Sequence, residues 1–316
     1  MPPDLEIDHK TPLNGSMAPY TEQVLISTGK PDWKSRIEDE DDAHLLQGLK
    51  KLLGRGGRFA DPFSNVLLTN SSFEATPSSA SSVVGQSGDS DAAQTGSAYV
   101  LPSFTYIPSI STTDASLETL IKGFVLPSSL PSHHPLLNTA SPTKPEDLPV
   151  RQPALQSAFP SARPVSELLV LICGHGGRDS RCGILGPLLV REFEQKLSEA
   201  GVSVLKSAPS LSASPHPPAA AAAAGKTGDR KLEARVGTIS HIGGHKFAGN
   251  IIVYIPPSFS QSGSASNHAL AGKGIWYGRV EPRHVEGIVK ETILGGKVVG
   301  DLFRGGVGRG GEVLRI

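Results

Sequence analysis

Blocks of hydrophobic positions separated by polar loops predict a mixed α/β protein. Three apolar runs in the first half are typical of strands, at 22–26, 66–68 and 99–107. Two helices are predicted between and after them, over 43–53 and 117–122. In the first helix Leu45, Leu49 and Leu52 share one stripe, and Gly54 follows where the helix should end. The first half is therefore expected to bury one face of each helix against a sheet.

The second half repeats this alternation. Residues 167–172 (ELLVLI) form a continuous apolar run, which indicates a central strand buried on both faces of a sheet. Four more strands are expected in this half, at 202–205, 236–239, 250–255 and 274–280. Two helices are expected as well, over 186–200 and from Pro282 to Gly295. The pattern favours an α/β fold in this half too.

Four segments rich in Pro, Ser, Ala and Gly interrupt this pattern, at 77–98, 127–164, 207–228 and 258–272. Their composition offers little apolar surface to offset the entropy of ordering, so we expect long disordered inserts. The second segment is the longest and richest in proline. It predicts three regions, namely an N-terminal domain over 1–126, a Pro-rich linker over 127–164 and a C-terminal domain over 165–316.

The two halves also resemble each other in sequence. Val24-Leu25-Ile26-Ser27, followed by Ser35-Arg36-Ile37, aligns with Val170-Leu171-Ile172-Cys173, followed by Ser180-Arg181-Cys182. Such short matches also arise by chance, so duplication and coincidence both stay open. Under duplication, Ser27 and Ile37 stand where the second copy has cysteines. Any thiol chemistry then belongs to the second half.

Composition excludes several classes of protein. The 30 basic residues balance 30 acidic ones, so no net charge favours nucleic acid as a partner. Only two cysteines occur, too few for a disulfide-rich scaffold. No apolar run reaches the roughly 18 residues that a membrane span needs, so no membrane insertion is expected. The start, MPPDLEIDHK, shows neither a signal peptide nor a presequence.

The candidate chemistry lies at two loops of the second half. Cys173 and Cys182 bracket an eight-residue loop after the predicted central strand, and His241-Ile-Gly-Gly-His245 follows the strand predicted at 236–239. Two thiols and two imidazoles suit zinc or an iron–sulfur cluster. A structural zinc module on these four residues and a metal-free dithiol oxidoreductase using the two cysteines remain alternatives. We expect His175 to support the site without being a ligand.

The segments ICGHGGRDSRCG, SHIGGHKFAGNIIVY and GIWYGRV closely resemble the sucrase/ferredoxin-like family of thioredoxin-like ferredoxins. The resemblance is strong over 167–300 and weaker over 5–126. It implies two thioredoxin-like units, the first without a cluster and the second with a [2Fe-2S] cluster. The implied ligands are Cys173, Cys182, His241 and His245.

The same resemblance implies a function. It points to a redox protein that exchanges single electrons with protein partners, in mitochondrial redox or thiol homeostasis, with the cytoplasm as the alternative location. An electron-transfer or oxidoreductase role is favoured over a hydrolase, because no pair of carboxylates suited to glycoside hydrolysis stands out in the sequence.

Overall fold

The computed structural model describes residues 5–77, 94–137, 148–209, 232–259 and 268–316. The four segments predicted to be disordered inserts lie partly or largely outside these residues. Within the described ranges, no helix combines the length and the apolar character needed to cross a bilayer.

The described strands form one mixed sheet that runs through both halves of the chain. The first half contributes β1 (Glu22–Ser27), β2 (Val66–Ser71), β3 (Thr95–Leu101), β4 (Thr105–Ser111) and β5 (Arg163–Pro164). The second half contributes β6 (Leu168–Cys173), β7 (Ser203–Val204), β8 (Glu233–Ile239), β9 (Ile251–Ile255), β10 (Lys273–Tyr277), β11 (Phe303–Val307) and β12 (Val313–Leu314). The strand order is β12-β11-β10-β9-β6-β8-β2-β1-β3-β4-β5, with β7 beside β8.

Both halves pair their strands in the same way. In the first half β1 lies parallel to β2 and antiparallel to β3, which is antiparallel to β4. In the second half β6 lies parallel to β8 and antiparallel to β9, which is antiparallel to β10. The matching order supports an internal duplication. It confirms the α/β class and is compatible with two thioredoxin-like units.

The helices of the two halves also correspond to each other. The first half has α1 (His44–Leu53) and α2 (Asp114–Leu120), and the second has α3 (Ser180–Glu199) and α4 (Pro282–Gly287). Both α2 and α4 continue directly into a short π-helix, Ile121–Val125 and Ile288–Leu294. Apolar faces of these helices pack on the strands of their own half, in two separate clusters of buried side chains.

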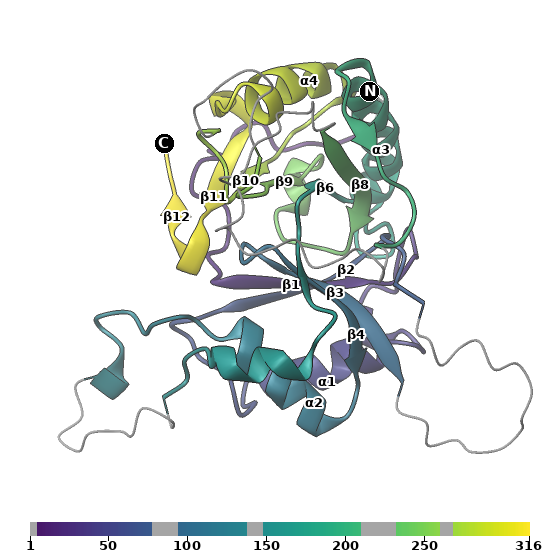
Figure 1. The fold of residues 1–316 in the computed structure, drawn as a ribbon. Helices are drawn as coiled ribbons and strands as arrows, with labels where there is room; N and C mark the ends of the chain where they lie inside the picture. Colours follow the sequence, from purple (N-terminus) through teal and green to yellow (C-terminus); the bar gives the residue numbers. More distant parts are fainter. Residues whose placement is uncertain (1–4, 78–93, 138–147, 210–231, 260–267) are drawn as a thin grey trace, which may run out of the picture.

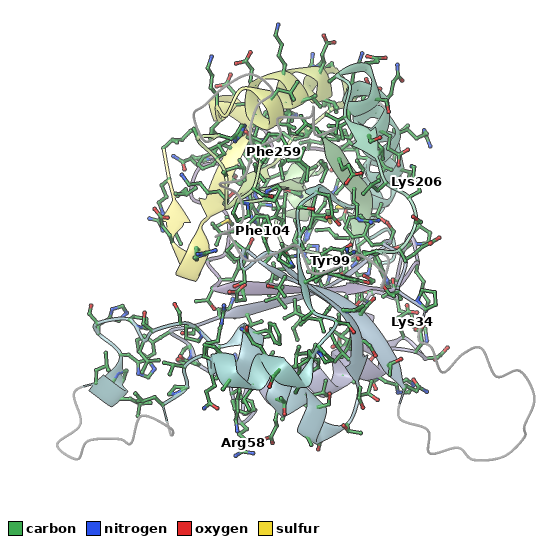
Figure 2. All side chains as sticks on the ribbon, in the orientation of Figure 1. Lys34, Arg58, Tyr99, Phe104, Lys206 and Phe259 are labelled. Carbon is green, nitrogen blue, oxygen red and sulfur yellow. The ribbon has the colours of Figure 1, made fainter. Side chains whose placement is uncertain are left out.

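A third cluster of buried side chains lies between the halves. The pairs of helices lie on opposite outer sides of the molecule, with the strands of both halves between them (Figure 1). Tyr99 and Phe104 of the first half, which Figure 2 labels, belong to this shared core. Trp276 of the second half belongs to the same cluster. Cys173 and Cys182 belong to it as well. The candidate site is therefore built where the two halves meet.

Several boundaries differ from the sequence prediction. The run at 99–107 is two strands, because a turn at Pro102–Phe104 separates β3 from β4. Helix α3 begins at Ser180, since the Asp179 carboxylate accepts a hydrogen bond from the Arg181 backbone N–H and caps the helix. Strand β11 was not predicted, because Gly305 and Gly306 break the apolar pattern. Added side chains at these glycines would press on Met17 and Leu314, respectively.

Part of the predicted linker is ordered against the first half. Residues Pro153–Ala158 form a 3-10 helix that contacts the π-helix Ile121–Val125. Phe159 is buried in the core of the first half, where its ring meets that of Phe124. The domain boundaries remain a prediction.

Candidate metal centre

The two cysteines are brought together by the end of β6 and the start of α3. Cys173 is the last residue of β6 and Cys182 lies in the first turn of α3. Both are free thiols, 1% and 0% exposed. The backbone N–H of Cys173 donates to the Asn250 carbonyl at 2.9 Å, which holds the end of the strand in place.

A hydrogen bond joins the two sulfurs. The thiol of Cys182 donates a hydrogen bond that lowers the pKa of Cys173 well below its ordinary value, although burial opposes this. The His241 imidazole and the His175 backbone N–H also lower the pKa of Cys173. The same contact, together with burial, raises the pKa of Cys182. The hydrogen bond thus favours the thiolate form of Cys173, and thiolate is the form that binds metals.

The two histidines form a second pair beside these sulfurs. Gly243 and Gly244 adopt positive φ angles of 82° and 75°, and this bend places the rings of His241 and His245 5.2 Å apart. The Nδ1 atom of His241 is buried and has no regular hydrogen-bond partner among the described residues. His245 is exposed. A buried imidazole nitrogen without a regular hydrogen-bond partner, on a ring that contacts a cysteine sulfur, is suited to metal ligation.

All four predicted ligands thus lie in one region, as two adjacent pairs. The residues come from the end of β6, the start of α3 and the loop after β8. Within the described part of the chain, no group of three or more His, Cys, Asp or Glu side chains is arranged to hold a metal ion. The two pairs are linked through His241, which contacts Cys173 and whose ring lies beside that of His245.

His175 is a buried residue that hydrogen-bonds to both the histidine loop and the first half of the chain. Its ring is 1% exposed, and its Nδ1 accepts a hydrogen bond of 3.0 Å from the His241 backbone N–H. Its Nε2 lies 2.9 Å from the Lys34 carbonyl oxygen, to which it must donate. Both ring nitrogens are occupied. His175 therefore positions His241 and links it to the first half.

A loop of the first half covers this region, a contact that the sequence pattern did not indicate. The Asp32 carboxylate accepts a hydrogen bond from the Gly177 backbone N–H at 3.2 Å. The Thr238 hydroxyl donates to the Pro31 carbonyl oxygen at 2.9 Å, and the buried Trp33 ring meets the His175 ring edge-on. The alignment of the two halves could have indicated this loop as part of the site. It shows that the loop follows β1 in the same way as the cysteine loop follows β6.

We expect the substitution Gly177→Ala to loosen this cover. A methyl group at Gly177 would sit 2.2 Å from the Trp33 carbonyl oxygen, so the backbone of one loop must shift. Overpacking of this kind typically costs about 1–3 kcal/mol of stability. In a Trp276→Phe background Trp33 is the only tryptophan, and its emission should move to longer wavelength.

The matched control is Gly287→Ala on α4, where an added methyl group meets nothing within 4 Å. It should leave the Trp33 emission and the denaturant midpoint of that background unchanged or raise the midpoint slightly. Unchanged emission and stability in Gly177→Ala would show that the two loops are not in contact.

Several named proteins are similar in sequence to this chain. "Altered inheritance of mitochondria protein 32" of Meyerozyma guilliermondii is 37% identical over 141 residues, 45% of this chain and 35% of that protein. The protein of the same name from Clavispora lusitaniae is 37% identical over 142 residues, 45% of this chain and 36% of that protein. "Actin patches distal protein 1" of Saccharomyces cerevisiae is 25% identical over 296 residues, 92% of this chain and 74% of that protein.

The chain spans about a third of the length of the first two relatives. No solved structure matches it. The sequence model described as "Sucrase/ferredoxin-like" matches residues 13–305, a range that contains strands β1 to β10 and all four candidate ligands. This confirms the resemblance seen in the sequence, and the chain belongs to the sucrase/ferredoxin-like family.

Proposed function

We propose that this protein binds a [2Fe-2S] cluster through Cys173, Cys182, His241 and His245 and transfers single electrons. When bound, such a cluster supplies reversible one-electron exchange. The observation that carries the proposal is the contact between a hydrogen-bonded pair of cysteines and the imidazole of His241, whose buried Nδ1 has no regular hydrogen-bond partner within the described part of the chain.

The division into two pairs favours two metal atoms over one. A structural zinc ion needs four ligands directed at a single point. In a [2Fe-2S] centre with mixed ligands, two cysteines hold one iron and two histidines hold the other. The pairing of Cys173 with Cys182, and of His241 with His245, follows this second arrangement. Zinc at the same residues is the competing metal.

A metal-free dithiol oxidoreductase is the second candidate, because the sulfurs of Cys173 and Cys182 are already in contact. Reactive thiols, however, are normally partly exposed so that a substrate can reach them. Cys173 and Cys182 are 1% and 0% exposed. Their burial supports a ligand role over direct attack on a substrate.

His245 gives the proposed centre its route to a protein partner. It is exposed, whereas both cysteines and His175 are buried. An electron would therefore enter or leave on the side of the histidine loop, next to the surface residue Lys246. The partner is a redox protein that docks over this loop.

The names of the first two relatives refer to the inheritance of mitochondria. On this likeness we propose that the protein works in the mitochondrion, in redox or thiol homeostasis. Fractionation of cells that produce the full chain tests the location. Recovery only in the cytosolic fraction would contradict it.

Electron paramagnetic resonance of the dithionite-reduced protein tests the proposed ligation. We expect a signal from one unpaired electron per chain, with couplings to two imidazole nitrogens. Labelling histidine with ¹⁵N should change those couplings. A reduced cluster without nitrogen couplings would exclude histidine ligands, and no signal at any reducing potential would exclude the cluster.

His175→Ala should keep the cluster and make it more labile. The substitution removes the acceptor for the His241 N–H and the donor to Lys34, and loss of a supporting hydrogen bond to a metal ligand typically costs 10–100-fold in metal affinity. Iron release to a chelator, followed by absorbance, measures the effect. Asn at this position can still accept from the His241 N–H, so His175→Asn should release iron more slowly than His175→Ala. Loss of one of the nitrogen couplings in both variants would instead make His175 a ligand.

A further inference from the structure

Arg304 of β11 is a buried cation whose hydrogen bonds all go to neutral groups. It is 1% exposed. Its guanidinium donates to four neutral oxygens, namely Ser16 Oγ at 3.1 Å, Ser16 O at 2.9 Å, Gly243 O at 3.1 Å and Asn250 Oδ1 at 2.8 Å. Among the described residues, no carboxylate forms an ion pair with it.

Such an environment is costly for a charge. Removing a guanidinium from water is unfavourable unless hydrogen bonds and an opposite charge compensate. Burial lowers the pKa of Arg304 to about 10, while the Cys173 sulfur acts in the opposite direction. Arg304 therefore remains charged at neutral pH. The negative charge that attracts it lies at the candidate metal centre.

The contacts of Arg304 reach both segments that carry the candidate ligands. Gly243 lies between His241 and His245, and a methyl group at the neighbouring Gly244 would overlap the guanidinium. Asn250 accepts from Arg304 and donates to the Gly244 carbonyl at 2.9 Å. The backbone carbonyl of Asn250 also accepts the N–H of Cys173.

Aromatic rings shield this charge from water. The guanidinium lies 5.4 Å from the centre of the Phe247 ring and 5.6 Å from that of Trp276. A charge enclosed in this way acts on its neighbours through a low dielectric, so its influence exceeds that of a surface cation. Arg279 provides the comparison. It lies over the same Phe247 ring at 5.2 Å, but it is close to the Asp8 carboxylate.

We propose that Arg304 is the fixed counter-charge of the metal centre and raises its reduction potential. The inference rests on the proposed [2Fe-2S] function. Two thiolates and two neutral imidazoles around a [2Fe-2S] core of charge +2 give a net charge of zero, and one electron from a protein donor makes it −1. Arg304 attracts the reduced state more strongly than the oxidised state. Its hydrogen bond to Gly243 also makes it a positioning residue for the histidine loop.

Spectroelectrochemical titration of Arg304→Met and Arg304→Lys tests the proposal. We expect Arg304→Met to weaken the uptake of the electron about tenfold, which corresponds to a midpoint potential about 59 mV lower. Arg304→Lys keeps the charge and should stay close to the wild-type potential. Arg279→Met is the matched control, and its potential should not change.

Asn250→Asp provides a test that leaves Arg304 in place, for the case that Arg304→Met does not fold. It places a carboxylate oxygen where the Asn250 Oδ1 lies, 2.8 Å from Arg304 Nη1. The added negative charge should lower the potential, as Arg304→Met does. Asn250→Leu removes the same amide without adding charge and should lower it less. Wild-type potentials in Arg304→Met or in Asn250→Asp would overturn the proposal. A wild-type protein without a reducible cluster would instead overturn the proposed function.

Discussion

Replacing either Cys173 or Cys182 by serine will remove the bound iron and the visible absorption of the protein almost completely. A serine hydroxyl is a hard, weakly acidic ligand, whereas iron–sulfur clusters are held by soft thiolates. These are the only two cysteines in the chain, so no other thiol can replace a missing one. The measurement is the iron content and absorption spectrum of protein purified without oxygen.

The serine variants must be shown to be folded. Both cysteines are buried in the core between the two halves, so circular dichroism and a denaturation curve should accompany each spectrum. His284→Ala is a control for the second half, because His284 accepts a hydrogen bond from the Glu281 N–H at the start of α4 and takes no part in the centre. Full iron content and an unaltered spectrum in a folded serine variant would remove that cysteine from the ligands.

The midpoint potential of the wild-type protein will fall as the pH rises. Reduction adds negative charge, so an imidazole ligand holds a proton more tightly in the reduced state than in the oxidised state. Proton uptake therefore accompanies reduction, and a lower pH favours it. For one proton per electron the slope approaches about 59 mV per pH unit. A potential that is flat between about pH 6 and 9 would contradict ligation by histidine.

Replacing His241 or His245 by cysteine should retain a cluster with a lower potential. Each change exchanges a neutral ligand for a negative one. Centres with two histidine and two cysteine ligands have reduction potentials a few hundred mV above those of ferredoxins with four cysteine ligands. Replacing one of the two histidines should therefore lower the potential by about 100 mV or more. Each variant should also lose part of the pH dependence. His284→Ala, away from the centre, should keep the wild-type titration, and a cysteine variant with the wild-type potential would not have lost a ligand.

The parts of the fold that depend on local pattern were predictable from the sequence. The apolar run at 167–172 is the buried strand β6, which lies between β8 and β9. The stripe of Leu45, Leu49 and Leu52 is the buried face of α1. Strand β11 was not predicted, because its Gly305 and Gly306 carry no side chains and the apolar pattern is lost there.

The proximity of the four candidate ligands was indicated by their residue types and spacing, and their role as ligands stays a prediction. The surroundings of the ligands were not. Arg304 stands in a glycine-rich stretch, where nothing in the local pattern indicates that its charge is buried. The cover provided by Asp32 and Trp33 depends on contacts between residues more than 140 positions apart in the chain. Such contacts arise only from the way the two halves meet.

Metal and sulfide analysis of the full chain, purified without oxygen, tests the central claim most directly. The account predicts two iron atoms and two acid-labile sulfides per chain, with little zinc. One zinc ion per chain without sulfide would contradict the cluster and favour a structural zinc site. A chain with no metal and a disulfide between Cys173 and Cys182 would contradict the account altogether.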